Sequence, residues 1–309
     1  MTVETKSGES GQESKGFLPS AVLLIRSRLE PISGWTWNTA AASFIAGRGS
    51  PPLMPSVLVA VSMVFISLSV YIYNDIIEAN MDKLNAVKRC RPLPSGKVSL
   101  KNALILVYLS GFCGLTILFF TNFYSFIFGL TYFCLLIAYS HPKIRIKKRF
   151  PLKESVLALC FPLTSLIGMY AVTNSFVIHA FFAGVVIALF VYTIEPVITD
   201  STDIEEDKLT GVKTLASTLS WERRTYLFAA GPFMAMVLIL LMYKALGFNG
   251  ILPVLTVTGG VIFLLFTSSV LKKYSEAAVV KARNTAHIYF ILLQISFIIG
   301  SINGDSALL

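Results

Sequence analysis

The sequence predicts an all-α, polytopic membrane protein, with about nine transmembrane helices in one bundle and an active-site cap that faces the cytoplasm. Three observations support this fold class. Hydrophobic residues make up 55% of the chain and charged residues only 14%. Apolar stretches long enough to cross a bilayer recur from residue 31 onward. Basic residues concentrate in every second connection between these stretches.

The apolar stretches follow a polar beginning of the chain. Residues 1–16 contain almost nothing apolar, and we expect them to form a disordered cytoplasmic tail before one transmembrane domain over residues 17–309. The first span is the least hydrophobic, because it holds Trp35, Trp37 and Asn38. It follows an amphipathic stretch that is suited to lie along the membrane surface instead. The predicted spans are 31–47, 53–74, 103–120, 123–139, 155–172, 178–198, 226–246, 251–271 and 286–303.

Charge placement predicts the orientation of these spans. With nine spans, all of the 26 basic residues except Arg48 and Lys244 fall on one side of the membrane. Lys and Arg accumulate in cytoplasmic loops. We therefore expect a multi-pass protein of the cell membrane whose N-terminus and long polar loops are cytoplasmic. The net charge of +9 is then a topology signal and requires no nucleic-acid partner.

Two triplets of carboxylates stand out against this apolar background. Asp75, Glu78 and Asp82 follow the second span with the spacing i, i+3, i+7, and Asp200, Asp203 and Asp207 repeat that spacing after the sixth. At about 100° of turn per residue, such positions lie within roughly 60° of one another on a helix. Asn74 adds a neutral oxygen to the first group. Carboxylate and amide oxygens suit Mg²⁺, which binds through a few carboxylates together with the oxygens of a phosphorylated substrate.

Basic residues lie near both triplets, as an anionic substrate would require. Arg91 follows the first triplet, Lys213 follows the second, and Lys143 closes the fourth span together with Tyr139. Each of these cations fits either an anion site or the positive-inside pattern. We interpret the run Lys147–Arg149 as part of that topology pattern.

These motifs resemble the UbiA superfamily of intramembrane prenyltransferases. That family carries an Asn-Asp-x-x-Asp-x-x-x-Asp motif after its second helix, which is similar to Asn74 through Asp82. Its Asp-x-x-x-Asp motif after the sixth helix matches Asp203 and Asp207. Its Tyr-x-x-x-Lys element matches Tyr139 and Lys143, and its Arg-Pro-Leu-Pro-Ser-Gly turn matches Arg91 through Gly96. The resemblance extends over essentially the whole chain after the tail. The one departure is Glu78, where the family usually has Asp.

The resemblance implies a prenyltransferase-like domain with two Mg²⁺ ions, a polyprenyl diphosphate donor and a lipophilic or aromatic acceptor within membrane lipid. The metals would ionise the donor to an allylic cation, with Asp75 and Asp203 as the essential catalytic acids. Acceptors of the quinone-precursor type and of the glyceryl ether phosphate type both remain open. The resemblance implies that the metal ligands are Asn74, Asp75, Glu78, Asp82, Asp200, Asp203 and Asp207, and that Arg91, Tyr139, Lys143 and Lys213 bind the diphosphate.

Three other interpretations of the same residues stay open. A membrane terpene cyclase of this superfamily would ionise the same donor and let the chain's own double bonds capture the cation. A transporter would use intramembrane acids to line an ion pathway. A catalytically silent relative would bind lipid only.

Overall fold

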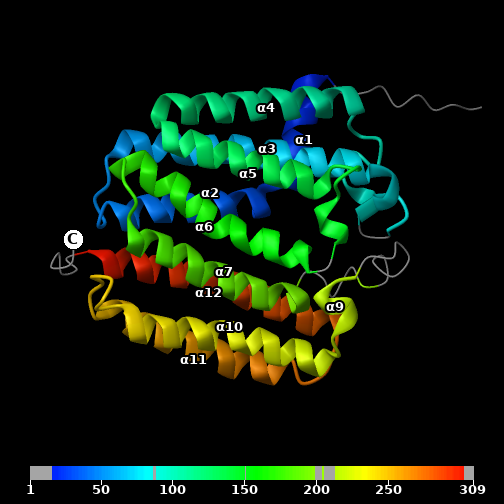
Figure 1. Cartoon of the computed structure of the whole chain (residues 1–309). Coiled ribbons are helices and arrows are strands. Elements are labelled where there is room, and N and C mark those ends of the chain that lie inside the picture. The colour runs from blue at the N-terminus through cyan, green and yellow to red at the C-terminus, as the bar shows by residue number, and fades with distance from the viewer. Residues whose placement is uncertain (1–15, 86–87, 150, 199–203, 205–212, 303–309) are drawn as a thin grey trace, which may run out of the picture.

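The computed structural model describes residues 16–85, 88–149, 151–198, 204 and 213–302, and within them it contains helices, turns and no strand. Long helices lie side by side and form one bundle (Figure 1). The predicted tail lies outside the described residues, apart from Gly16. The long helices are α2 (Leu29–Ala46), α3 (Leu53–Asp82), α4 (Leu100–Thr121), α5 (Phe123–Ser140), α6 (Leu152–Thr173), α7 (Ile178–Ile198), α10 (Trp221–Met242), α11 (Ile251–Val270) and α12 (Glu276–Ser301).

All of these helices except α2 are long and apolar enough to cross a membrane, which makes eight candidate spans among the described residues. Helix α2 corresponds to the first predicted span. It is less hydrophobic because it contains several polar residues, and these point into the bundle. Asn38 and Ser43 are buried, and they bond to the backbone oxygens of Phe161 and Gly168 in α6. The predicted bundle is confirmed, and α2 belongs to it through polar contacts rather than hydropathy.

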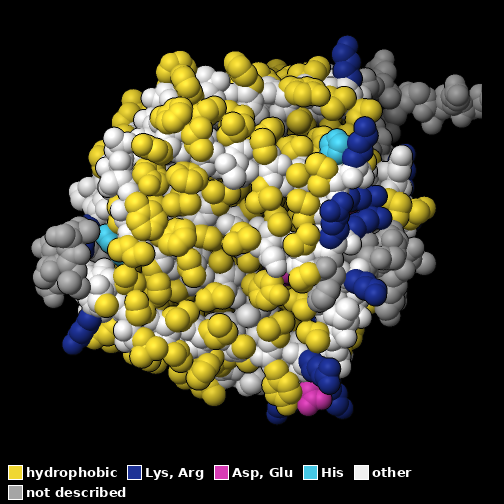
Figure 2. Space-filling view, viewed as in Figure 1, with side chains coloured by type: hydrophobic (Ala, Val, Ile, Leu, Met, Phe, Trp, Pro, Cys, Tyr) yellow, Lys and Arg dark blue, Asp and Glu magenta, His cyan; other side chains and the backbone are white. Residues whose placement is uncertain are grey.

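The outer surface has the character expected of a protein within lipid. Hydrophobic side chains cover most of the face in Figure 2, while many of its Lys and Arg side chains gather towards one end of the bundle. Large apolar residues such as Phe112, Phe120 and Leu265 are exposed along the helices. This distribution fits an integral membrane protein.

Helix α3 places the first acid triplet on a rigid element. The predicted span ended at residue 74, but the helix is 30 residues long and continues to Asp82. Asp75, Glu78 and Asp82 therefore stand on one continuous helix, as their spacing predicted. The helix ends where the chain enters a polar turn that leads to the short 3₁₀-helix η1 (Lys88–Cys90).

Among the described residues, four short helices connect or precede the long ones. Helix α1 (Phe17–Ser27) covers the predicted amphipathic stretch, and it buries Ser20 and Leu24 while Leu18 and Val22 are exposed. Helix α9 (Leu215–Thr218) lies at the end of the bundle where α3 and α7 also end (Figure 1). The remaining two are η1 and η2 (Ile146–Lys148), which follow α3 and α5.

Candidate functional site

A cavity of about 860 Å³ opens inside the bundle between α2, α3, α5, α6, α7 and α12. Most of its lining is apolar, as is usual for small-molecule sites. Asn74, Tyr139 and Ser140 stand among its few polar residues, and they come from the ends of α3 and α5. The apolar wall includes Trp35, Leu136, Phe161, Val191, Ile194 and Phe290.

The cavity also reaches the outer surface of the bundle. Trp37 of α2 and Ile291 and Ile295 of α12 line it, and all three are exposed. Glu30 and His287 stand on the same two helices and approach to 3.5 Å between Oε1 and Nε2. The cavity lining therefore extends to the outer surface at α2 and α12.

The first acid triplet lies beside this cavity and is shielded from solvent. Asp75 is 2% exposed and Asp82 is 1% exposed, whereas Glu78 is half-buried. Charged carboxylates with so little contact with water require partners. The structure supplies a basic partner for each of the three.

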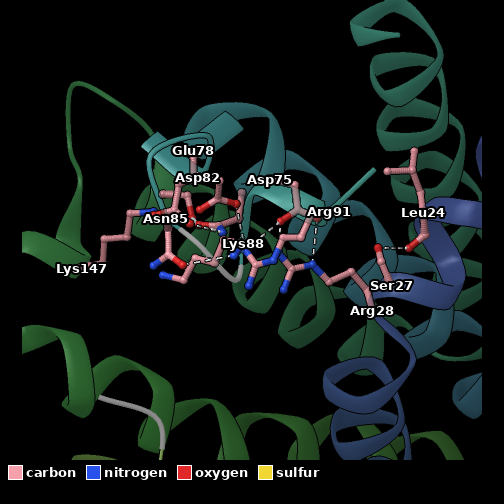
Figure 3. Close-up of polar contacts among 12 residues, drawn as sticks. Leu24, Ser27, Arg28, Asp75, Glu78, Asp82, Asn85, Lys88, Arg91 and Lys147 are labelled. Carbon is pink, nitrogen blue, oxygen red and sulfur yellow. Dashed lines mark hydrogen bonds and ion pairs between the residues drawn. The ribbon is translucent and has the colours of Figure 1, made fainter. Parts of the chain in front are cut away.

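Two arginines neutralise Asp75 and Asp82 (Figure 3). Arg28 lies between α1 and α2, and its Nε donates to Asp75 Oδ2 over 2.8 Å while its Nη2 pairs with Oδ1. Arg91 donates from Nη1 to Asp82 Oδ2 over 2.9 Å, and the same atom lies 3.9 Å from Asp75 Oδ1. Arg91 is thus placed beside the acids, as predicted.

Lys147 of η2 neutralises the third acid. Its Nζ lies 2.6 Å from Glu78 Oε1 and donates to Asn74 Oδ1 over 2.9 Å. Asn74 donates in turn to Glu78 Oε2 over 2.7 Å, and Ser140 donates to Asn74 Oδ1 over 2.7 Å. Lys147 and Arg28 approach the acidic row from opposite ends (Figure 3).

Burial changes the acidity of these cations. It lowers the pKa of Arg28 to about 10, with the charge of Arg91 acting in the same direction. Burial also lowers the pKa of Lys147, while the neighbouring Glu78 opposes that shift. Both side chains are held in low-dielectric surroundings where an unpaired charge is costly.

The donor set suits a hard divalent cation. Asn74, Asp75, Glu78 and Asp82 present only oxygen atoms as ligands. Within the described part of the chain, Oδ1 of Asp82 is buried and accepts no hydrogen bond, so it has unused capacity for a ligand. No three His, Cys, Asp or Glu residues converge on one metal position among the residues described. The predicted second triplet, Asp200, Asp203 and Asp207, falls outside those residues.

The remaining predicted site residues are placed differently. Tyr139 lines the cavity. Lys143 is exposed, and its backbone N–H donates to Nδ1 of His141. Lys213 is also exposed, just before α9. The structure brings Asn74, Asp75, Glu78, Asp82 and Arg91 together beside the cavity that Tyr139 lines, and it leaves Lys143 and Lys213 on the surface.

Sequence reasoning missed two contributors to this region, Lys147 and Glu195, and it did not identify the partner of a third, Arg28. Lys147 was assigned to the basic residues that set membrane topology. That pattern does not predict which basic side chain turns towards the cavity. Arg28 lies between the amphipathic stretch and the first span, and no local motif connects it with Asp75. Glu195 lines the cavity from α7, and an acid inside a predicted span was a signal that could have found it.

Comparison with known proteins gives a consistent result. Residues 36–293 match the model of the UbiA prenyltransferase family. A digeranylgeranylglyceryl phosphate synthase of Thermococcus sibiricus is 28% identical over 253 residues, which is 82% of this chain and 87% of that protein. A 4-hydroxybenzoate octaprenyltransferase of Francisella tularensis subsp. novicida is 28% identical over 150 residues, 48% of this chain and 51% of the other.

Solved structures share the fold. A digeranylgeranylglyceryl phosphate synthase superposes with a TM-score of 0.71 at 22% identity, covering 93% of this chain and 99% of that one. A UbiA homologue from Archaeoglobus fulgidus bound to GPP and Mg²⁺ superposes with a TM-score of 0.66 at 17% identity, covering 90% and 99%. At these identities the likeness concerns the fold.

Proposed function

Because the chain belongs to the UbiA prenyltransferase family, we propose that it transfers an isoprenyl chain from a polyprenyl diphosphate to a lipophilic acceptor in a Mg²⁺-dependent reaction. One observation carries this proposal. A buried row of acids with paired cations stands at the polar edge of an apolar cavity that reaches the outer surface. A diphosphate bound beside the acids would leave its isoprenoid tail in the cavity.

The donor's head group would lie against the end of α3. Asn74, Asp75, Glu78 and Asp82 would hold Mg²⁺ on this side, and Asp200, Asp203 and Asp207 would complete the set. The bound metal would stabilise the developing charge of the leaving diphosphate. Arg91 reaches the same place, with its side chain 30% exposed at the acids, and it would contact the diphosphate directly. Tyr139 would contact it from the cavity wall, and Lys143 and Lys213 are further candidates.

The allylic carbon would enter a part of the cavity that is rich in aromatic faces. Trp35 lies 4.5 Å from Phe161 between ring centroids, and Phe161 lies 5.8 Å from Phe290. The indole N–H of Trp35 donates to the hydroxyl of Tyr71 over 2.7 Å, which holds both rings in place. Aromatic faces attract cations, and a dry wall protects a reactive intermediate from water.

Two acceptor types fit this arrangement, an aromatic or quinone-precursor acid and a glyceryl ether phosphate. Both carry an anionic group and an apolar body. The names of two relatives support these two types: a digeranylgeranylglyceryl phosphate synthase and a 4-hydroxybenzoate octaprenyltransferase. We further propose that the N-terminus and the acid-bearing end of the bundle face the cytoplasm, as the basic loops predict.

Product analysis tests the proposal. Purified protein with Mg²⁺ is incubated with geranyl, farnesyl or geranylgeranyl diphosphate, with and without phenolic acids and glyceryl ether phosphates, and products are identified by mass spectrometry. We expect a prenylated product that requires both the acceptor and Mg²⁺. A terpene formed from the donor alone would show that the protein is a terpene cyclase and not a prenyltransferase. Absence of any diphosphate release with every donor would overturn both.

A further inference from the structure

We propose that Lys147 is a diphosphate-binding residue that, in the metal-free protein, is held by an ion pair with Glu78 and a hydrogen bond to Asn74. When the substrate complex binds, Lys147 would leave these oxygens for the diphosphate. This inference rests on the proposed function and adds two things to it. It names a binding residue outside the motifs, and it predicts that metal and diphosphate bind cooperatively.

The first step is competition for the same atoms. Nζ of Lys147 lies 2.6 Å from Glu78 Oε1 and 2.9 Å from Asn74 Oδ1, and its side chain is only 12% exposed. These oxygens belong to the proposed metal ligands. A divalent cation bound to the same oxygens would repel the ammonium group at these distances, so Lys147 is expected to move when metal binds them.

The second step is where Lys147 can go. Its partner Asn74 lines the cavity, and so does Ser140, which bonds to the same Asn74 oxygen. The ammonium group is therefore one hydrogen bond away from the polar edge where the diphosphate is proposed to bind. A primary ammonium on a flexible stem can exchange partners over such a distance.

The third step is the local backbone, which directs Lys147 inward. Arg145, just before η2, adopts a left-handed conformation with φ 47° and ψ 56°. A residue with a side chain enters this region at some cost, so the turn must be held by its surroundings. The turn separates exposed Lys143 from Lys147, whose side chain is mostly shielded, although both belong to the same basic segment.

The energetic consequence is positive coupling. If metal binds alone, it takes Glu78 away from Lys147, and the poorly solvated ammonium group then has no partner, which weakens metal binding. Diphosphate that binds alone must compete with Glu78 for Lys147. When both bind, every charge has a partner, so each ligand should raise the affinity for the other by the same factor, on the order of tenfold or more.

The experiment measures binding rather than turnover. Titration calorimetry on the full chain in detergent gives the affinity for Mg²⁺ alone and for inorganic pyrophosphate at buffered free Mg²⁺. Lys147→Met keeps the aliphatic stem and removes the charge. We expect Lys147→Met to bind Mg²⁺ about tenfold more tightly when pyrophosphate is absent. At saturating Mg²⁺, we expect the same variant to bind pyrophosphate about tenfold more weakly. Lys148→Met, in the same short helix η2, is the matched control, and it should leave both affinities unchanged.

Opposite changes in the two affinities separate this role from structural damage. If Lys147→Met weakened the binding of both Mg²⁺ and pyrophosphate, or if only Lys148→Met weakened pyrophosphate binding, the proposal would be wrong. Lys147→Arg keeps the charge and should retain the coupling, which checks the result should Lys147→Met unfold. If wild-type protein bound no pyrophosphate at any Mg²⁺ concentration, the proposed function itself would fail. If it bound both ligands without coupling, only the role of Lys147 would be lost.

Discussion

Arg28 and Asp75 form a two-point ion pair across 47 positions of sequence, with a 2.8 Å hydrogen bond from Nε to Oδ2 and a second contact from Nη2 to Oδ1. The pair ties the junction of α1 and α2 to the acid-bearing end of α3. It also neutralises a buried carboxylate that Arg91 approaches only to 3.9 Å. Removal of either partner should therefore affect both stability and metal binding.

Loss of Arg28 should destabilise the metal-free protein, and Mg²⁺ should reverse part of that loss. Breaking a buried pair by removing one partner costs up to about 3–5 kcal/mol, because the other charge stays buried. In Arg28→Ala, a divalent cation would replace the missing positive charge beside Asp75. Thermal unfolding in detergent, with and without Mg²⁺, measures this effect. The control Arg26→Ala removes an exposed cation from α1 and should change little. Equal destabilisation with and without Mg²⁺ would contradict the prediction.

Neutralising the proposed catalytic acids should abolish diphosphate release. Asp75→Asn and Asp203→Asn keep the size of the side chain and remove its charge, so we expect turnover to fall at least about 100-fold. Release of pyrophosphate from a prenyl diphosphate is the measurement. Glu205→Gln serves as control, because helical periodicity places this position about 160° from Asp203. Normal turnover in either Asn variant would rule out the assigned metal ligands.

Filling the cavity should impair donor use without unfolding the protein. Ile194 lines the cavity from α7 and is buried, so Ile194→Trp would take up space proposed for the isoprenoid tail. We expect a higher KM for long donors than for short ones, because the longer tail needs more of the cavity. Leu265→Trp on the exposed face of α11 is the size-matched control. Unchanged kinetics for every donor length would show that the tail lies elsewhere.

Helix α2 should be displaced by any side chain at Gly168. A Cβ built there would lie 2.2 Å from the backbone oxygen of Thr39 and 3.1 Å from Cβ of Ala42, so α2 and α6 would have to separate. Overpacking of this kind typically costs about 1–3 kcal/mol. Gly168→Ala should therefore lower the unfolding midpoint in detergent. Gly250→Ala, where nothing lies within 4 Å of the new atom, should leave it unchanged. Similar midpoints for both variants would contradict the close packing.

Much of the fold was predictable because its signals are local. Runs of apolar residues predicted the long helices, and the spacing of Asp75, Glu78 and Asp82 predicted their shared face, since both depend only on helical periodicity. Helix α2 was the weakest prediction for a physical reason. Its polar residues form hydrogen bonds to other helices inside the bundle, as where Gln294 of α12 donates to Asn38 over 2.8 Å. A hydropathy average counts such residues against a membrane span even though they are buried.

The sequence by itself therefore determined that this is a helical membrane protein with acids grouped at the end of its second predicted span, and its motifs indicated the family. Only the tertiary structure decided which cations meet those acids. Lys143 and Lys147 are alike in charge and four residues apart, and the backbone turn at Arg145 leaves one exposed and brings the other to Glu78. Arg28 reaches Asp75 from a distant segment. Such pairings depend on the path of the chain in space, because charges attract according to distance and burial rather than sequence separation.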